Sequence, residues 1–524
     1  MKRPVVLLLA ASLLGPFALP AQTPEETFGE VIDVRVVNVE AVVTDRKGKR
    51  VTGLQAGDFR LLVDGAEVPV DYFTEVAEGV ALPAPAPVED PAGAAPAAPI
   101  APVPAGPVGR SFLVFIDDSL SIAAQRDMVL KTLAGDLGRL GPGDRMAVVA
   151  FDGGRLHRLA DWTGDRKALA AAFDEARQRP AWGLLTLAER RSSLAERHWL
   201  GLEDAARFDV YSNESPFDEF EDESLEPQQF ARIARAAEAA AAALRSISLP
   251  PGRKAMLLLS GGWPTLRPMR QLIQDANRLG YTLYPVDVPG VDIAMMPGDV
   301  TADRPTPGPA TMHSPPWELE AQYTLHFLAE ATGGKEAING NRLAALQRAD
   351  EDTRSYYWLG FSPAWKADDR HHKIELQVRR PGLEVRARGG FSDLSPALLA
   401  EMETEGLLRF GRGTGSSGRL QVEMGEARPA GWRTVEVPVT LVLPAVLADG
   451  EETELVLSVG ALDRFGASSE LPKIPFRVAP SAGAEARSQV TLRLRNVEQK
   501  LVFHVRNPQT GSQMVEELSF QPGK

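Results

Sequence analysis

The chain has 524 residues, a formal net charge of −13 and 44% hydrophobic residues. This length predicts about two to four domains, and the composition is that of a globular protein rather than a disordered one. Nonspecific nucleic-acid binding needs clustered Lys and Arg, so we expect no nucleic-acid partner for this acidic chain. The chain has no cysteine, which excludes thiol nucleophiles, iron–sulfur clusters and zinc-thiolate sites.

The N-terminus has the pattern of an export signal. Lys2 and Arg3 precede an apolar run from Val5 to Leu19, and small residues end at Ala21. The run is short for a membrane span, so we predict a signal peptide over residues 1–21; an uncleaved N-terminal anchor is the alternative. We therefore expect an exported protein, periplasmic or secreted, with no membrane span once the signal peptide is removed.

The next segment is rich in β-branched residues. Strands are predicted at Val31–Val43, Phe59–Val63 and Val68–Phe73, which together form an N-terminal β module over residues 28–79. A tract rich in Pro and Ala follows over residues 80–108. This composition cannot bury a core and favours extended conformations, so the tract is interpreted as a linker.

From residue 109 onward, short apolar runs alternate with helical segments. Repeated βα units of this kind predict an α/β fold with a doubly wound, mostly parallel sheet over residues 109–392, interrupted by an insertion at about 180–227. The predicted order is strand Phe112–Ile116, helix Ile122–Leu140, strands Met146–Phe151 and Arg155–Trp162, helices Asp165–Gln178 and Gln228–Ile247, strand Ala255–Leu259, helix Leu266–Leu279, strand Thr282–Val288, helix Trp317–Ala331, strand Lys335–Ile338 and helix Arg342–Arg354.

The remaining chain is predicted to be β only. Strand patterns at Tyr356–Phe361, Lys373–Arg379 and Val385–Gly389 close the central region. Further short strands recur from Thr404 to the end of the chain, and their spacing predicts an immunoglobulin-like β-sandwich over residues 400–524.

The residues that could carry chemistry follow the first central strand. Asp117, Ser119 and Ser121 stand after Ile116, where the carboxyl ends of parallel strands form a ligand-binding crevice. One carboxylate and two hydroxyls at alternating positions can converge on a hard divalent cation such as Mg²⁺. A simpler role is also open, because Ser121 precedes a predicted helix and could cap its free N–H groups.

The pattern Asp117-x-Ser119-x-Ser121 after an apolar strand resembles the metal-ion-dependent adhesion site of von Willebrand factor A (VWFA) domains. This resemblance covers residues 109 to about 338 and implies a Rossmann-like fold with a bound Mg²⁺, Mn²⁺ or Ca²⁺ ion. Flanking motifs are similar to those of exported bacterial VWFA-related proteins: Val36–Val39, Thr44–Gly48, Gly53-Leu54, Asp58-Phe59, Thr332–Gly334 and Tyr356–Phe361.

The chain departs from the family pattern at two metal ligands. The family's site is completed by a threonine on a second loop and by an aspartate after a later strand; here Ser260 stands near the aspartate position, and Thr186 is the candidate threonine, in surroundings that do not match. Asp118 and Asp152 are alternative sources of the missing carboxylate. Because one charge is lost, attraction for a divalent ion is weaker, and a non-functional metal site stays open.

The sequence predicts a non-enzymatic protein. Seven histidines are spread over different segments, and the metalloprotease, serine-hydrolase and phosphate-loop motifs are absent. The leading hypothesis is a protein-protein interaction or adhesion module that grips an acidic group of a protein partner, with or without a metal ion. The alternative is a structural scaffold with a vestigial metal site that assembles through its β domains. A metal-dependent hydrolase is the third interpretation.

Overall fold

The computed structural model describes residues 36–82, 106–186, 188–189, 227–247, 250, 252–261, 263, 265–289, 316–411, 420–443, 453–464, 466–471, 473–478, 486–508 and 512–522. The predicted signal peptide (residues 1–21) lies outside these residues, as do most of the predicted linker and most of the predicted insertion. Among the described helices, none is both long enough and apolar enough to cross a membrane.

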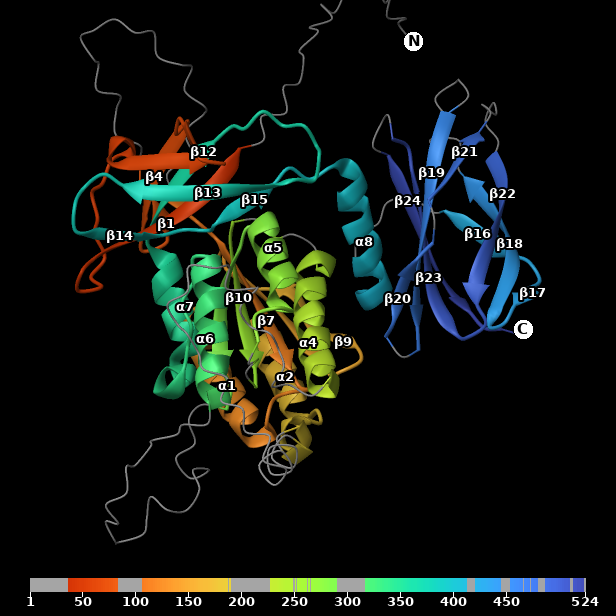
Figure 1. Ribbon diagram of the computed structural model, residues 1–524, viewed down its shortest axis with the longest axis horizontal. Coiled ribbons are helices and arrows are strands. Elements are labelled where there is room, and N and C mark those ends of the chain that lie inside the picture. Colours follow the sequence, from red (N-terminus) through yellow and green to blue (C-terminus); the bar gives the residue numbers. More distant parts are fainter. Residues whose placement is uncertain are drawn as a thin grey trace, which may run out of the picture. The chain divides into compact units, whose positions relative to one another are not determined.

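The described helices coincide closely with the predicted ones in the central region (Figure 1). Asp165 caps the second of them, because its side chain accepts a hydrogen bond from the backbone N–H of Lys167 at 2.8 Å. The helices are α1 (Ala123–Asp136), α2 (Arg166–Gln178), α4 (Pro227–Ser246), α5 (Met269–Leu279), α6 (Pro316–Ala331), α7 (Ala345–Arg354) and α8 (Pro396–Phe410), with 3₁₀ turns at Ala56–Asp58, Leu137–Arg139 and Asn339–Ala344.

A five-stranded sheet forms the centre of the region between residues 110 and 287. Its spatial order is β11 (Tyr281–Asp287), β10 (Arg253–Ser260), β7 (Arg110–Asp117), β8 (Arg145–Phe151) and β9 (Leu156–Thr163). The first four strands run parallel to one another. The edge strand β9 is antiparallel to β8, because a tight turn from Asp152 to Arg155 reverses the chain between them.

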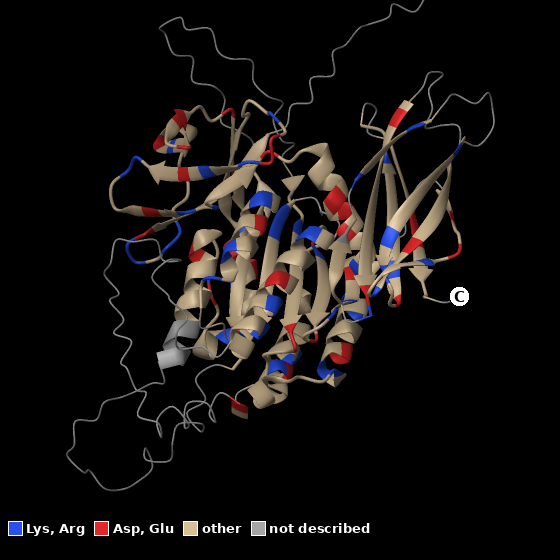
Figure 2. Ribbon diagram, turned by 45° about the vertical axis from the view of Figure 1, so that its right-hand side comes forward, with Lys and Arg blue, Asp and Glu red and all other residues tan. Residues whose placement is uncertain are grey.

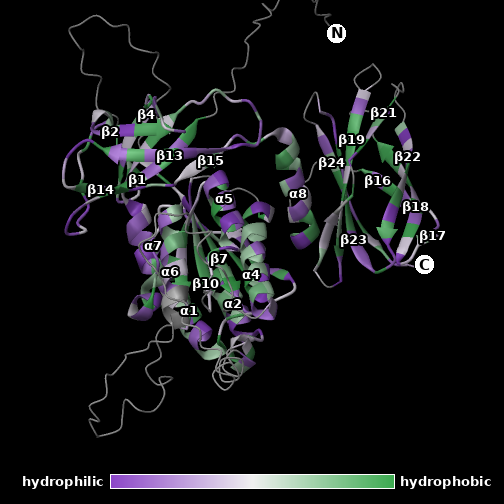
Figure 3. Cartoon of the chain, in the orientation of Figure 1, coloured by the Kyte–Doolittle hydropathy of each residue, from purple (hydrophilic) through white to green (hydrophobic). Residues whose placement is uncertain are grey.

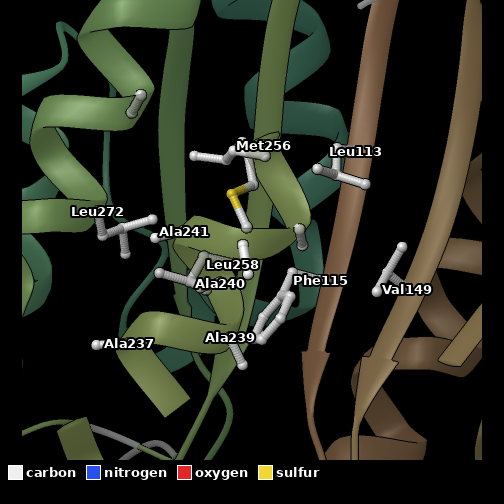
Figure 4. Packing of buried hydrophobic residues seen from close by; sticks show 14 of the residues in the cluster. Leu113, Phe115, Val149, Ala237, Ala239, Ala240, Ala241, Met256, Leu258 and Leu272 are labelled. Carbon is white, nitrogen blue, oxygen red and sulfur yellow. The ribbon is translucent and has the colours of Figure 1, made fainter. Parts of the chain in front are cut away.

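Helices bury both faces of this sheet. On one face, the Ala-rich helix α4 and helix α5 pack on Leu113, Phe115 and Leu258 (Figure 4). On the other face, α1, α2 and α7 cover Val114 and Ile116. All eight residues of β7 are buried, and β7 and β10 are among the most hydrophobic strands in the view by hydropathy (Figure 3). A strand covered on both faces needs apolar side chains on both, which explains its continuous apolar run.

Two antiparallel sheets combine strands from before and after the central region. Their pairing joins residues that are far apart in the chain, as in the register of Val39 with Leu359. One sheet has the order β14 (Leu383–Arg386), β1 (Val37–Asp45), β12 (Tyr356–Phe361), β4 (Tyr72–Ala77), β5 (Val80–Ala81) and β6 (Gly106–Pro107); the other has β15 (Gly390–Ser392), β13 (His371–Val378), β2 (Phe59–Val63) and β3 (Ala66–Val68).

Two further antiparallel sheets form the C-terminal region and share one apolar core. Val437 and Leu441 face this core from one sheet, and Leu457 and Phe503 face it from the other. The first sheet contains β16 (Gln421–Met424), β17 (Arg428–Gly431), β18 (Thr434–Leu443) and β22 (Ala486–Arg495); the second contains β19 (Thr453–Asp463), β20 (Ser468–Glu470), β21 (Ile474–Val478), β23 (Gln499–Arg506) and β24 (Gln513–Phe520).

The predicted fold class is wrong. The strands pair antiparallel in four of the five described sheets, and the central sheet is only partly parallel, so the chain is mostly antiparallel β rather than a doubly wound parallel fold. The βα rhythm of a sequence does not specify which strands pair: a tight turn makes β9 antiparallel to β8, and β1, β2 and β4 find partners far along the chain.

Individual elements also differ from the predictions. The predicted strand Val68–Phe73 is divided, because β3 ends at Val68 and β4 begins at Tyr72. Residues 404–410, predicted to begin a β-only region, belong to helix α8, which Ser395 caps by accepting from the N–H of Leu398 at 3.1 Å. The predicted strand Lys335–Ile338 is reduced to a single parallel bridge between Ala337 and Val286. A short bridge needs only two backbone hydrogen bonds, which the pattern of side chains does not reveal.

Candidate functional site

The loop after β7 is organised by one oxygen of Asp117, the last residue of that strand. Its Oδ1 accepts from the N–H of Ser119 at 3.1 Å, the hydroxyl of Ser119 at 2.5 Å and the N–H of Leu120 at 3.2 Å. An aspartate that accepts from backbone groups two and three residues ahead closes a local turn. The spacing of Asp117 and Ser119 therefore fixes the shape of the loop.

The other oxygen of Asp117 joins this loop to the end of β10. Oδ2 accepts from the hydroxyl of Ser260 at 2.9 Å and from Nε1 of Trp263 at 3.2 Å. Asp117, Ser260 and Trp263 are all completely buried. The structure thus brings Asp117, Ser119 and Ser260 together, as the sequence predicts, and adds an indole that the prediction did not include.

Burial dominates the acidity of Asp117. Loss of hydration raises the pKa of this carboxyl above its ordinary value, although the hydrogen bonds from Ser119, Ser260 and Trp263 act in the opposite direction. Burial is therefore the main influence on the pKa of this carboxyl, and the three side-chain donors offset part of it.

Ser121 does not play the capping role proposed for it. The residue that precedes α1 is Ile122, and no side chain caps that helix. The hydroxyl of Ser121 is buried and has no hydrogen-bond partner among the described residues. The capping prediction for Ser121 is therefore wrong, because its hydroxyl accepts no hydrogen bond from the N–H groups of α1.

The carboxylates of Asp118 and Asp152 both have other hydrogen-bond and ion-pair partners. Asp118 is buried between two guanidinium groups, those of Arg126 at 2.6 Å and Arg179 at 2.9 Å. Oδ1 of Asp152 accepts from the N–H groups of Gly154 and Arg155. Its Oδ2 lies 2.6 Å from Nε2 of His157. Neither carboxylate is therefore directed at Asp117.

Thr186 lies at a cavity of about 290 Å³ that also borders Ser119 and Asp152. Its hydroxyl accepts a long hydrogen bond, 3.4 Å, from Nη1 of Arg232. Thr186 and Ser119 therefore share one cavity, as a common site requires. The cavity is completed by Gly153, Trp182, Leu185, Arg232 and Arg235.

The gathered residues do not fit a divalent cation in this arrangement. The two oxygens of Asp117 already accept five hydrogen bonds, three on Oδ1 and two on Oδ2. Within the described part of the chain, no cluster of three or more Asp, Glu or His residues could hold a metal. The basic side chain of Arg235, which lines the same cavity, would also repel a cation.

The structure reveals functional candidates that the sequence did not single out. Trp182 and Leu185 are 50% and 53% exposed beside the cavity, and Arg235 is exposed as well. The apolar cluster at the start of the predicted insertion was a usable signal for Trp182 and Leu185. No sequence signal marked Trp263, three residues after Ser260, because spacing along the chain does not show which side chain turns inward.

Comparisons with known proteins give only distant similarities. No family model and no curated protein matches this chain. Among solved structures, the pilus adhesin SpaC from Lactobacillus rhamnosus GG is 8% identical with a TM-score of 0.27, covering 78% of this chain and 53% of the adhesin. A beta-glucosidase from Kluyveromyces marxianus is 10% identical with a TM-score of 0.14, covering 57% of this chain and 34% of the enzyme. This chain spans about half of the adhesin, and similarities this weak do not establish a shared fold.

Proposed function

We propose that this protein is a non-enzymatic, exported protein-interaction module of the cell envelope or secreted space. We further propose that it binds an acidic group of a protein partner at the cavity bordered by Ser119, Trp182 and Arg235. The observation that carries the proposal is an exposed arginine beside an exposed tryptophan at this cavity. The export pattern at residues 1–21 and the motifs that resemble VWFA-related proteins support the extracytoplasmic setting.

Arg235 supplies the positive charge of the proposed contact. It is exposed and has no ion pair among the described residues, whereas Arg232 is held by Glu189 through Nη1 at 2.5 Å and Nη2 at 3.2 Å. A guanidinium pairs with a carboxylate through two parallel hydrogen bonds, which gives direction as well as charge. Arg235 would thus receive the acidic group that the family resemblance assigns to a metal ion.

Trp182 and Leu185 supply apolar contact area next to that charge. Tryptophan and arginine are the residue types most enriched at energetically dominant positions of protein interfaces. Exposed apolar side chains lose their contact with water when a partner covers them, which favours association. The combination suits a partner surface in which an acidic side chain lies next to an apolar one.

The backbone under this surface is anchored to the loop after β7. The N–H of Trp182 donates to the carbonyl of Asp118 at 2.8 Å, and the N–H of Gly183 donates to the carbonyl of Ser121 at 3.0 Å. A Cβ on Gly183 would lie 2.5 Å from the carbonyl carbon of Ser121, so the two segments are in close contact. Preorganisation of this kind lowers the entropy lost on binding.

A metal ion is not part of this proposal, because the carboxylate of Asp117 already has its donors. Lys and Arg are interspersed with Asp and Glu along the described elements (Figure 2), which favours a protein partner over nucleic acid.

The test is retention of envelope proteins on the immobilised full chain, compared with Arg235→Glu and Trp182→Ala. We expect a specific partner to be retained by the wild type, with and without chelator, and lost by at least about tenfold with either variant. Arg428→Glu, which changes an exposed arginine on β17, serves as the charge-matched control. If both variants retain the partner as well as the wild type does, the proposed site is wrong and the scaffold hypothesis is favoured. If chelator abolishes retention by the wild type, the contact depends on a metal ion.

A further inference from the structure

A second cavity, of about 330 Å³, lies between the two antiparallel sheets that flank the central region in the chain. Its apolar base comes from Val63 of β2 and Val68 of β3. Its walls are aromatic: Phe361 ends β12, Phe391 lies on β15, and Trp365 lies between β12 and β13. These elements differ from those around Arg235, so this cavity is independent of the proposed function.

The aromatic side chains pack around Phe391. Its ring centroid is 5.5 Å from that of Phe361 and 6.1 Å from that of Trp365, both edge-on, and 5.0 Å from the stacked ring of His372. Edge-to-face packing holds aromatic rings in fixed orientations. The negative faces of such rings attract a cation that comes within about 6 Å of the ring centre.

A buried carboxylate also borders the cavity. Asp393 is only 3% exposed; its Oδ2 accepts from the backbone N–H groups of Lys366 and Ala367. Its Oδ1 has no hydrogen-bond partner among the described residues. A buried acceptor without a donor costs free energy, and a donor from a ligand would remove that cost.

The other charged groups at the cavity leave it acidic. Asp71 is exposed and accepts from the N–H of Ser362 at 2.8 Å. His372 faces Asp64, with Nδ1 and Oδ2 separated by 2.8 Å, so its charge when protonated is compensated. Lys366 is exposed, and it is the only Lys or Arg among the residues that line the cavity. Asp71 and Asp393 therefore outnumber it.

We propose that this cavity binds a positively charged side chain, the guanidinium or ammonium group of a protein partner. Its N–H groups would donate to Oδ1 of Asp393, while its alkyl part and positive charge lie against the rings of Trp365 and Phe391. An anion would be repelled by Asp71 and Asp393, and an apolar group would leave Oδ1 without a donor. The volume is near the lower end for ligand pockets, which suits one side chain rather than a large cofactor.

The experiment uses ¹⁹F NMR of the full chain labelled with 5-fluorotryptophan. The chain has eight tryptophans, and the Trp365 resonance is assigned with Trp365→Phe. The probes are Nα-acetyl-L-arginine amide, its neutral isostere Nα-acetyl-L-citrulline amide, and a Gly-Gly-Arg-Gly-Gly amide peptide. We expect the arginine probe and the peptide to shift the Trp365 resonance with millimolar or tighter affinity, and the citrulline probe to leave it unchanged.

Two carboxylate variants test the charge. Asp393→Asn should weaken binding by about tenfold, because an amide cannot provide the ionic acceptor, and Asp71→Asn should weaken it less. Asp368→Asn is the matched control, because Asp368 is exposed on the loop that carries Trp365 and does not line the cavity. A shift of the other seven tryptophan resonances in Asp393→Asn would mean that this variant disturbs the fold. In that case, Asp71→Asn and the comparison of the arginine and citrulline probes decide whether the cavity binds a cation.

Three results would overturn the proposal. One is an equal response to the citrulline and arginine probes, and another is no response to either. The third is binding of the capped amino acid without binding of the peptide, which would assign the cavity to small free cations instead of a partner's side chain.

Discussion

The indole Nε1 of Trp263 donates a hydrogen bond to Oδ2 of Asp117 across 3.2 Å, and this bond joins the loop after β10 to the end of β7. Both side chains are completely buried. With the hydroxyl of Ser260, the indole satisfies Oδ2 of Asp117. The relationship explains how the Asp117–Ser121 loop can keep its shape through uncharged donors.

The Trp263→Phe variant tests this role. Phenylalanine keeps most of the apolar bulk but removes the donor, so the free energy of unfolding should fall by about 1–2 kcal/mol. Urea unfolding followed by circular dichroism measures the change. The matched variant is Trp432→Phe, because Trp432 is 83% exposed and its replacement should alter stability by less than about 0.5 kcal/mol. Equal effects of the two variants would disprove the role of Trp263.

Contact between the two loops also depends on Gly261. A Cβ at this position would lie 1.8 Å from the backbone carbonyl oxygen of Leu120, so Gly261→Ala forces the loops apart. We expect a loss of about 1–3 kcal/mol in the free energy of unfolding, measured in urea. Gly57→Ala is the control, because a Cβ there would meet no atom within 4 Å. An unchanged midpoint for Gly261→Ala would show that the loops do not touch in solution.

Asp352 on α7 links the central sheet to the flanking antiparallel strands. It pairs with Arg386 of β14 at 2.6 Å and lies 3.7 Å from Arg50 and from Lys335. Burial acts to raise the pKa of Asp352, but the charges of Arg386, Arg253 and Lys335 outweigh it and hold the pKa below its ordinary value.

This pKa predicts acid sensitivity. A carboxyl whose pKa is lower in the folded state stabilises the fold above its unfolded pKa of about 3.9, and that stability is lost as the pH falls through the folded value. Asp352→Asn should therefore lower stability near neutral pH by about 3–5 kcal/mol and flatten the dependence below about pH 4. Thermal unfolding across pH measures both effects. Glu351 is an exposed neighbour on α7, so Glu351→Gln should change neither the stability nor its pH dependence. If Asp352→Asn lost stability below about pH 4 as steeply as the wild type, Asp352 would not be the cause of the acid sensitivity.

We expect His504 to make the contact between α8 and the C-terminal sheets dependent on pH. Its Nδ1 lies 2.9 Å from Oγ1 of Thr404 on α8, and its Nε2 lies 3.1 Å from Oε1 of Gln513 on β24. Burial lowers the pKa of His504 below its ordinary value. The unfolded chain therefore takes up the proton more readily, and stability falls as the pH drops through the unfolded pKa of about 6.5.

We expect the wild type to lose at most about 1.4 kcal/mol through this residue between about pH 7.5 and about pH 5.5. His504→Gln should reduce that loss, as measured by urea unfolding at both pH values. His326→Gln is the comparison, because the side chain of His326 is 57% exposed. The assignment would not survive if His504→Gln kept the full pH dependence of the wild type.

Local patterns were sufficient for most central elements. The apolar run of β7 follows from burial on both faces, and the periodic helices α2, α4 and α5 begin and end within a few residues of the predictions. The sequence also placed Asp117, Ser119 and Ser260 near one another, because the ends of neighbouring parallel strands lie at one edge of a sheet. These are short-range properties, which periodicity and strand order can predict.

Strand pairing and the chemistry of the site depended on the tertiary structure. The sequence does not show that β1 pairs with β12 or that residues 404–410 are helical. Nor does it show that the indole of Trp263 turns inward to Asp117, because a side chain's partner is determined by packing between loops that are distant in the chain. By itself the sequence determined where the candidate loop lies. Only the tertiary structure decided that the carboxylate of Asp117 accepts from uncharged donors and that Trp182 and Arg235 are exposed at the neighbouring cavity.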